Sequence, residues 1–428
     1  MALIVQKYGG SSVRNTERIK HVAERVVAAH AEGHDVVVVV SAMGDTTDQL
    51  LRMAYEMGPV PSRRELDMLL TSGERISNAL TAMAVHTLGV PACSFSGAQA
   101  GVITSSAHGR ARIIGIEPWR VREALDHGTI AMVAGFQGVS RETREVTTLG
   151  RGGSDTTAIA LAAALKADVC EIYTDVAGVY TADPRIVPDA RQLQHLTYEA
   201  MQAMAAGGAK VLAPSSVAYA SRHGVTVHVR SSADGDGPGT VVSAGAPEEL
   251  RTPPAPFTGV AHDLSSAEVT MTAVPDRPGV TADVFGLLAD AGAESDLVVH
   301  HAVPSPDGPR SDITLVLPAS DAPAVLAALR RHRDGLGYEG VTYRDDIGRV
   351  SLVGSGMRER TGALTAFREA LTGAGVPVGP VSASDTRISA VCRSPRLPEG
   401  IRALHEAFGL GAGVTVAQPA GGRRRRPS

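Results

Sequence analysis

The loop Thr147-Thr-Leu-Gly-Arg-Gly-Gly-Ser-Asp155 combines residue types that bind anions. A glycine-rich turn that opens a helix presents free backbone N–H groups and the positive end of the helix dipole, which favour phosphate or carboxylate. Arg151 can hold a carboxylate through two parallel hydrogen bonds, and Gly152 and Gly153 let the backbone approach a ligand closely. A helix is expected to follow at residues 156–166. Taken alone, this loop is also compatible with an ordinary connection from a strand to a helix.

Other polar residues that suit a ligand site follow apolar runs elsewhere in the first half of the chain. Because ligands of open α/β sheets bind at the carboxyl ends of the strands, residues at these positions are expected to share one edge of a sheet. Each of them has an ordinary structural explanation when it is considered alone, but together they indicate a binding site. In chain order they are Lys7, Ser41, Thr47, Thr174 and Asp175.

The elements that position these residues alternate between strands and helices. The run at residues 35–40 is apolar and β-branched almost throughout, which is typical of a strand buried on both faces of a parallel sheet. A helix capped near Asn15 precedes it, with apolar residues at helical spacing. The fold class is therefore α/β, with a doubly wound and mainly parallel sheet. The expected strands are residues 2–6, 35–40, 90–95, 129–136, 168–174 and 226–230.

Composition excludes several classes of protein. The chain has 428 residues and a formal net charge of −4; since residues 423–426 are four arginines, the rest has a net charge of about −8, which argues against nucleic acid as a partner. Cys93, Cys170 and Cys392 are far apart and lack metal-ligand spacing, so reduced thiols in the cytoplasm are expected. No signal peptide and no long apolar span is apparent, so no membrane partner is expected.

The second half contains an internal repeat behind a linker rich in proline, alanine and charge. A helix is expected between Gly279 and Gly292, and another at the same interval between Gly362 and Gly375. A strand precedes each helix, and further strands are expected at residues 311–317 and 386–392. The expected domains are a first domain at residues 1–243, a linker and entry strand at 244–264, two small ferredoxin-like (βαββαβ) domains at 265–340 and 347–418, and a disordered basic tail at 419–428.

Taken together, the motifs resemble those of the aspartokinases, in the amino-acid kinase superfamily, over essentially the whole chain. The repeat is similar to the paired ACT domains that bind amino acids in that family. Six motifs in the family's order carry the resemblance, with conservative changes in the first. They are Lys7-Tyr-Gly-Gly-Ser-Ser-Val, Val40-Ser-Ala-Met-Gly-Asp-Thr-Thr-Asp48, Thr71-Ser-Gly-Glu-Arg75, Thr148-Leu-Gly-Arg-Gly-Gly-Ser-Asp155, Tyr173-Thr-Asp-Val176 and Tyr180-Thr-Ala-Asp-Pro-Arg185.

The resemblance implies transfer of a phosphoryl group from ATP, with Mg²⁺, to the side-chain carboxylate of L-aspartate. It implies catalytic roles for Lys7, which would contact the γ-phosphate, and for Asp155, which would order that lysine. Lys210 would approach the phosphates from a second helix, and the Ala213 that follows departs from the family's usual histidine. No protein cage for the metal is expected, because phosphate oxygens and water would hold Mg²⁺. The implied substrate-binding residues are Ser41, Thr47, Glu74, Arg151, Gly152, Gly153 and Ser154, and the implied ATP-binding residues are Lys7, Tyr8, Gly9, Gly10, Thr174, Asp175, Tyr180, Asp183, Arg185 and Lys210.

The same resemblance places an amino-acid effector site in the ACT pair, with several departures from the family's pattern. Asp276 is retained, but Glu294 and Pro377 replace asparagines and His300 replaces a glutamine. We therefore expect weak or altered feedback by lysine and threonine. We also expect a homodimer or higher homo-oligomer formed through the ACT domains, whose exposed sheet edges need cover. A mixed assembly is not expected, since no methionine that could start a short second subunit occurs between Met204 and Met271, although a start at another codon, for instance at Val241 or Val242, stays open.

Two alternative functions stay open at this point. The chain could be a related amino-acid kinase that phosphorylates another carboxylate, such as glutamate or N-acetylglutamate. It could also be an inactive amino-acid sensor built on the ACT pair, although Lys7, Arg151, Asp155 and Asp175 would then have no purpose. An active aspartate kinase would serve either the synthesis of the aspartate-family amino acids or a specialised aspartate-derived pathway.

Overall fold

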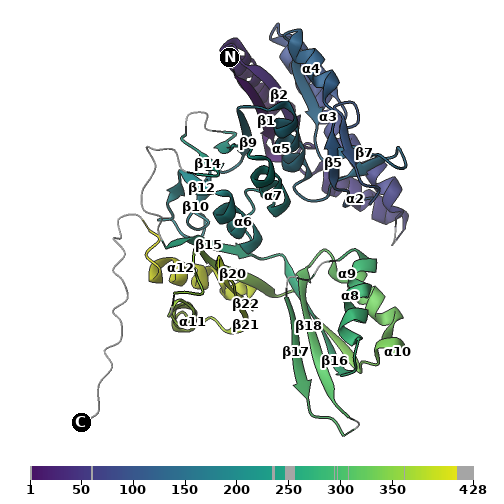
Figure 1. The fold of residues 1–428 in the computed structure, drawn as a ribbon, viewed down its shortest axis with the longest axis vertical. Coiled ribbons are helices and arrows are strands. Elements are labelled where there is room, and N and C mark those ends of the chain that lie inside the picture. The colour runs from purple at the N-terminus through teal and green to yellow at the C-terminus, as the bar shows by residue number, and fades with distance from the viewer. Residues whose placement is uncertain are drawn as a thin grey trace, which may run out of the picture. The chain divides into compact units, whose positions relative to one another are not determined.

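The computed structural model describes residues 2–58, 61–233, 237–245, 256–293, 295, 297–306, 308–360 and 362–411. The chain forms two compact units (Figure 1). The first comprises Met1–Tyr180, Gln192–Ala206 and Lys210–Pro254, and the second comprises Thr181–Arg191, Gly207–Ala209 and Ala255–Ser428. The expected basic tail at 419–428, Glu294 and residues 246–255 of the linker lie outside the described residues. Within the described part of the chain, no helix combines the length and apolar character needed to cross a membrane.

An eight-stranded sheet forms the centre of the first unit, in the order β12-β14-β13-β9-β1-β2-β6-β3. Neighbouring strands are parallel except for β13 and β14. This mainly parallel sheet confirms the predicted α/β fold class. Strand β2 is apolar and buried along nearly its whole length, as expected for a strand covered on both faces. The strands are β1 (Leu3–Tyr8), β2 (Asp35–Val40), β3 (Ala92–Phe95), β6 (Ile130–Ala134), β9 (Val169–Thr174), β12 (His195–Thr197), β13 (Val227–Ser231) and β14 (Thr240–Ser243).

Helices cover both faces of this sheet. On one face α1 and α3 pack together, and Ile19 and Val22 of α1 join a buried cluster with Val38 of β2. On the other face α5 contacts β1, β2 and β9. Asn15 caps α1 as expected, since its side chain accepts a hydrogen bond from the Arg18 N–H. The helices are α1 (Thr16–Ala31), α2 (Thr46–Met57), α3 (Arg63–Thr87), α4 (Trp119–Asp126), α5 (Gly153–Leu165), α6 (Tyr198–Gly207) and α7 (Pro214–His223).

A smaller sheet in the first unit was not predicted. Its strands are only three or four residues long, and their order is β5-β4-β7-β8. The last of them, β8, leads directly into the glycine-rich loop before α5. The strands are β4 (Val102–Thr104), β5 (Ile113–Ile116), β7 (Gln137–Ser140) and β8 (Val146–Thr148), and a separate two-stranded pair consists of β10 (Val179–Tyr180) and β11 (Gln192–Leu193).

The second unit contains two four-stranded antiparallel sheets, each packed against helices. The strand after the linker, β15, pairs with β20, so it belongs to the later sheet. One sheet is β15 (Phe257–Asp263), β20 (Ile347–Gly354), β22 (Arg387–Arg393) and β21 (Val378–Ala383), packed against α11 (Ala363–Gly373) and α12 (Leu397–Ala407). The other is β17 (Leu297–Val303), β18 (Arg310–Pro318), β16 (Ser266–Pro275) and β19 (Gly340–Arg344), packed against α8 (Val280–Ala291), α9 (Ala322–Arg331) and α10 (Arg333–Leu336).

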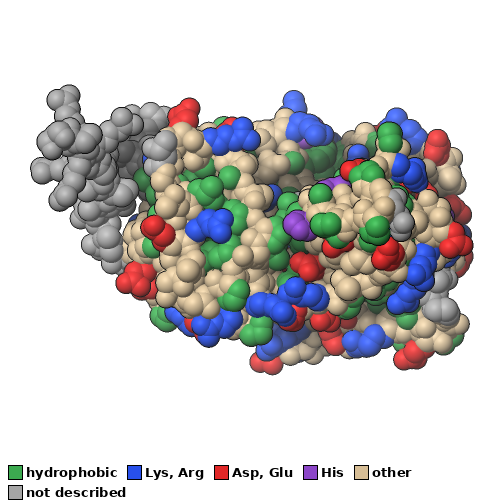
Figure 2. All heavy atoms as spheres, turned by 90° about the horizontal axis from the view of Figure 1, so that it is seen from below, with side chains coloured by type: hydrophobic (Ala, Val, Ile, Leu, Met, Phe, Trp, Pro, Cys, Tyr) green, Lys and Arg blue, Asp and Glu red, His purple; other side chains and the backbone are tan. Residues whose placement is uncertain are grey.

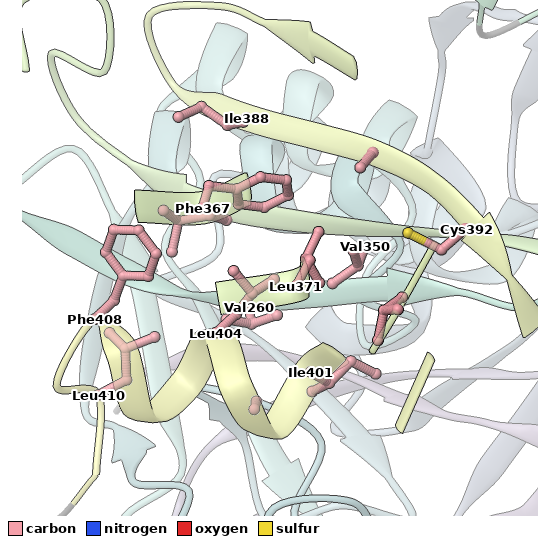
Figure 3. Packing of buried hydrophobic residues seen from close by; sticks show 14 of the residues in the cluster. Val260, Val350, Phe367, Leu371, Ile388, Cys392, Ile401, Leu404, Phe408 and Leu410 are labelled. Carbon is pink, nitrogen blue, oxygen red and sulfur yellow. The ribbon is translucent and has the colours of Figure 1, made fainter. Parts of the chain in front are cut away.

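The segment Thr181–Arg191 leaves the first unit and packs into the core of the second. Ala182 and Val187 belong to the same buried cluster as Phe367 and Leu404. Figure 3 shows Phe367 and Leu404 within this cluster, together with side chains from β15, β20 and β22. Figure 2 shows acidic and basic side chains interspersed over the face that it draws, as the small net charge suggests.

The Phe367 side chain is fully buried, so its removal tests the core of the second unit. We expect Phe367→Ala to lower the free energy of unfolding by about 3–5 kcal/mol, because it removes apolar contacts and leaves a cavity. Leu364→Ala on the same helix is the matched control, since Leu364 is 44% exposed and its loss costs less than about 0.5 kcal/mol. Urea denaturation measures both. Equal effects of the two substitutions would contradict the packing of α11.

Candidate active site

A salt bridge joins Lys7 and Asp155, with Nζ 2.6 Å from Oδ1. Each side chain is only 11% exposed, so water screens the two charges weakly. Strand β1 places Lys7 on the face of the sheet that α5 covers, and Asp155 lies in the first turn of α5. The positive end of the helix dipole favours a carboxylate at this position. The pair therefore fixes a lysine ammonium near the carboxyl end of β1.

The Tyr8 side chain lies on the opposite face of the sheet from Lys7, and its role in ATP binding stays a prediction. Its ring is 1% exposed and stacks on Tyr173 beneath α1, with the ring centroids 4.7 Å apart. The sequence places the end of the strand at residue 6, whereas β1 continues to Tyr8. Because consecutive side chains of a strand point to opposite faces, the Tyr8 side chain is directed away from the face of Lys7.

A buried polar network that the sequence analysis missed surrounds this tyrosine pair. Glu171 accepts hydrogen bonds from Gln6 Nε2 and the Tyr173 hydroxyl, each at 3.0 Å, and forms a salt bridge with Arg230 at 3.0 Å. The Tyr8 hydroxyl donates to Gln6 Oε1. Burial raises the pKa of Tyr173 to about 12. Polar residues at every second position of two otherwise apolar strands were the signal, and the network satisfies polar groups that α1 covers.

The loops that follow β1 and β2 contact each other through their backbones. The Gly44 N–H donates to the Gly10 carbonyl at 3.0 Å, and a Cβ atom on Gly10 would lie 2.9 Å from the Ala42 carbonyl oxygen. Only glycine fits at residue 10 without a shift of this backbone. The Gly9 N–H donates to the Tyr173 carbonyl at 3.3 Å, and a Cβ atom on Gly9 would lie 3.5 Å from Lys7 Nζ. The Lys7 ammonium thus lies beside a glycine backbone.

The glycine-rich loop adopts the geometry that its composition predicts. Gly150 and Gly152 have φ values of +76° and +71°, in the left-handed region that favours glycine. Helix α5 then begins at Gly153, three residues earlier than expected. Ser154 packs against the end of β6, since a Cβ atom on Gly135 would lie 2.8 Å from its hydroxyl. Arg151 is exposed, and no carboxylate among the described residues forms a salt bridge with it.

Glu74 has the most unusual environment in this region. It is 3% exposed, and its Oε1 accepts a hydrogen bond from the Ala42 N–H at 3.1 Å. Its Oε2 is buried without a hydrogen-bond partner among the described residues. Burial raises the pKa of Glu74 to about 7. A carboxylate held in this way favours a cationic ligand, because an ammonium group would satisfy the free oxygen and offset the cost of burial.

Helix α3 carries Glu74 and packs closely against the loop after β2. A Cβ atom on Gly73 would lie 2.8 Å from the Ala42 Cβ, so this glycine permits the close approach. The Ser77 hydroxyl donates to the Ser41 carbonyl at 2.7 Å, which fixes the backbone of Ser41. Thr47 lies in the first turn of α2, partly buried.

Near Lys7, Thr174 is the last residue of the neighbouring strand β9, and Asp175 follows it. The Thr174 hydroxyl donates to Asp175 Oδ1 at 3.0 Å, and Asp175 is exposed. Tyr180 is half-buried in β10. Lys210 is exposed in the turn between α6 and α7, which corrects the expectation that it lies on a helix. Ala213, the residue before α7, packs against Gly152, since a Cβ atom on Gly152 would lie 2.2 Å from the Ala213 Cβ.

Asp183 and Arg185 belong to the second unit, unlike the other predicted nucleotide residues. They pair with each other, and Asp183 Oδ2 lies 2.8 Å from Arg185 Nη2. Hydrogen bonds from Arg185 hold the pKa of Asp183 below its usual range. Their role in ATP binding stays a prediction.

The first unit thus brings most of the predicted residues to the carboxyl ends of β1, β2, β6 and β9. No group of three or more His, Cys, Asp or Glu side chains that could hold a metal ion occurs among the described residues. The arrangement provides a lysine ammonium beside a glycine backbone, an exposed arginine and a buried carboxylate, which suits two anionic ligands, one of them carrying an ammonium group. The residues concerned are Lys7, Gly9, Gly10, Ser41, Glu74, Arg151, Gly152, Gly153, Ser154, Asp155 and Thr174.

Comparison with known proteins agrees with this geometry. Residues 2–231 match the model of the amino acid kinase family, and residues 350–408 match an ACT domain model. The chain is 55% identical to the aspartokinase of Mycobacterium tuberculosis, covering 96% of this chain and 97% of the relative. It is 54% identical to the aspartokinase of Corynebacterium glutamicum over the same shares, and 44% identical to that of Thermus thermophilus over 96% and 99%.

Two solved structures show the same fold. The aspartate kinase of Synechocystis is 39% identical, with a TM-score of 0.53, covering 98% of this chain and 71% of that one. Aspartokinase III of Escherichia coli, in complex with aspartate and ADP, has a TM-score of 0.77 at 24% identity, covering 95% and 99%. The chain therefore belongs to the amino acid kinase family and, within that family, to the aspartokinases. It is a phosphotransferase with an ACT-containing second unit.

The raised pKa of Glu74 predicts how stability depends on pH. Because the folded-state pKa of about 7 exceeds the ordinary glutamate pKa of 4.5, the ligand-free protein should lose stability as the pH rises from 4.5 to 7. The loss is about 1.4 kcal/mol per pH unit and about 3 kcal/mol in total. Glu74→Gln removes the titrating group. The free energy of unfolding of this variant, minus that of the natural protein, should therefore be larger at pH 8 than at pH 5.

Urea denaturation at both pH values measures this difference. Glu65→Gln, at an exposed position of the same helix, is the control and should show no comparable trend. A difference between Glu74→Gln and the natural protein that is independent of pH would contradict the assignment.

Proposed function

We propose that this chain transfers the γ-phosphoryl group of ATP to the side-chain carboxylate of L-aspartate, giving 4-phospho-L-aspartate and ADP. A carboxylate oxygen forms the new bond to the γ-phosphorus. The bond from that phosphorus to the oxygen bridging to the β-phosphate breaks, and its electron pair stays on ADP. The attacking carboxylate has an ordinary pKa near 4 and is already ionised at neutral pH, so no general base is needed.

The observation that supports this proposal most is that one edge of the sheet carries both a paired lysine and a buried carboxylate with a free oxygen. Lys7 is held by Asp155, whereas Glu74 keeps a buried oxygen without a partner among the described residues. In the proposed complex, Lys7 neutralises charge that develops on the transferred phosphoryl group. Glu74 accepts the α-ammonium of aspartate, and Arg151 holds its α-carboxylate.

The remaining roles follow from position. Gly9 and Gly10 present backbone beside the Lys7 ammonium, where the phosphates of ATP would lie. Thr47 and Ser154 donate hydrogen bonds to aspartate, and Gly152 and Gly153 let the backbone approach it. On the nucleotide side the proposal keeps Thr174, Asp175, Tyr180, Asp183, Arg185 and Lys210. Mg²⁺ bound to the phosphates would neutralise part of their charge, with oxygens of phosphate and water as its main ligands.

A hydroxamate assay for acyl phosphate tests the reaction. The natural protein, incubated with ATP, Mg²⁺ and hydroxylamine, should form product with L-aspartate and not with L-glutamate or N-acetyl-L-glutamate. Product with one of the other acceptors would favour a related amino-acid kinase. Nucleotide binding without any product would favour an amino-acid sensor. The pathway that uses the product, aspartate-family or specialised, follows from the genes that are expressed together with this one.

Variants of Lys7 and Arg151 should fail in different ways. Lys7→Ala should lower kcat by about 10²–10³ with little change in KM, because the lysine acts on charge in the transition state. Arg151→Ala should raise KM for aspartate strongly, and Arg151→Lys should have an intermediate effect because it keeps the charge but loses the two parallel bonds. Lys20→Ala, at an exposed position of α1, is the control for charge removal. An unchanged aspartate KM in Arg151→Ala would disprove the carboxylate role.

Feedback by lysine and threonine is proposed to be weak or absent. Asp276, His300 and Pro377 are all exposed, and Pro377 has neither an N–H nor a side-chain amide to offer. Each unpaired group of a buried effector costs about 1–3 kcal/mol, so two or three such losses weaken binding by a factor of hundreds. Activity should therefore change little when lysine and threonine are titrated singly and together. Strong joint inhibition below 1 mM, roughly the level at which a working site responds, would contradict this.

The ACT pair is proposed to form a homodimer or a higher homo-oligomer in the cytoplasm. Strand β17 lies at the edge of its sheet, and His300, His301 and Ala302 on it are exposed, so this edge can pair with another copy. Native mass spectrometry of protein made from the natural gene should show copies of the full chain alone. A co-purifying fragment of about 18 kDa, the size of the ACT half, would show a mixed assembly instead.

A further inference from the structure

A further buried carboxylate, Asp67, lies on α3, which also carries Glu74, and is not among the residues discussed above. It is 0% exposed and accepts hydrogen bonds from three directions. The Thr148 hydroxyl donates to Oδ1 at 2.6 Å, the Gly109 N–H donates to Oδ1 at 3.0 Å, and His108 Nδ1 lies 2.7 Å from Oδ2. Hydrogen bonds from several donors compensate for the cost of burying this carboxylate.

The donors to Asp67 belong to the two segments that form the base of the glycine-rich loop. Thr148 is the last residue of β8, three residues before Arg151. Gly109 lies on the other side, since a Cβ atom on Gly150 would lie 3.2 Å from the Gly109 carbonyl oxygen. Helix α3 packs against β8, in the region of Figure 1 where α3, β5 and β7 are labelled. Asp67 therefore joins α3 to both sides of this loop.

The same helix carries Glu74. Asp67 and Glu74 are seven residues apart, so both project from one side of α3, about two turns from each other. Helix α3 thus bears the carboxylate proposed to bind the α-ammonium of aspartate. Through Asp67 it also holds the base of the loop that carries Arg151, proposed to bind the α-carboxylate.

We propose that Asp67, with Thr148 and His108, is a positioning group that sets the place of Arg151 relative to Glu74 and thereby determines the affinity for the α-amino-acid end of the substrate. The proposal rests on the proposed function of Arg151 and Glu74. The neighbouring ionisable groups are Glu145, whose Oε2 lies 3.3 Å from His108 Nε2, and Arg64, which forms a salt bridge with Glu145. Glu145 contacts the ring nitrogen of His108 that Asp67 does not contact.

Substitution of Thr148 provides a matched test. Thr148→Val keeps the shape of the side chain but removes the donor, whereas Thr148→Ser keeps the hydroxyl. We expect Thr148→Val to raise KM for aspartate about tenfold and to leave KM for ATP unchanged. The tenfold figure corresponds to the loss of one hydrogen bond to the buried Asp67 carboxylate. Thr148→Ser should stay within about twofold of the natural protein for both substrates. His108→Ala, at a partly exposed side chain, should raise the aspartate KM in the same direction and serves if Thr148→Val does not fold.

A double-mutant cycle separates positioning from a general structural role. If Thr148 acts through Arg151, Thr148→Val should change the aspartate KM less than about twofold in an Arg151→Ala background. An equal effect in both backgrounds, an unchanged aspartate KM in Thr148→Val, or a parallel rise in both KM values with a lower melting temperature would overturn the proposal. An Arg151→Ala variant with unchanged aspartate KM would instead show that the proposed function of Arg151 is wrong.

Discussion

The site depends on the salt bridge between Lys7 and Asp155. An isolated lysine ammonium at this depth would be costly to bury, and the carboxylate in the first turn of α5 compensates for it while the helix dipole stabilises that carboxylate. The pair requires β1 and α5 to meet at a fixed distance. The parallel sheet supplies this, because β1 lies between β2 and β9 and α5 packs across all three strands.

Near this salt bridge, the first unit contains other charged groups that a ligand could pair with. Glu74 is buried with one oxygen free of hydrogen bonds within the described residues, and Arg151 is exposed on a loop whose glycines permit close approach. Because an empty Glu74 site disfavours the ionised carboxylate, binding of an ammonium group gains free energy there. The proposed substrate, with an α-ammonium and two carboxylates, matches this set. Helix α3 connects Glu74 to the loop of Arg151, since it bears Glu74 and also contacts β8 through Asp67.

The sequence predicted the sheet and the edge of the site because strand ends and glycine motifs are local signals. It missed features that depend on tertiary packing. No local signal indicated that β1 continues to Tyr8 and directs its side chain to the face that α1 covers. The short strands β4, β5, β7 and β8 have too few residues to show a period, and no local pattern indicates that Thr181–Arg191 packs with the second unit. Asp67 could have been noticed, because it lies seven residues before Glu74, a spacing that places two side chains on one side of a helix.

The central claim is that an ammonium group of the substrate completes the site at Glu74. The direct test is the pKa of the Glu74 carboxyl group, followed by carbon-13 NMR in the full chain with and without aspartate and a non-hydrolysable ATP analogue. The account predicts a value of about 7 in the empty protein and a clear decrease when aspartate binds, because the α-ammonium stabilises the ionised form. Binding of aspartate with no change in the Glu74 pKa would contradict the account.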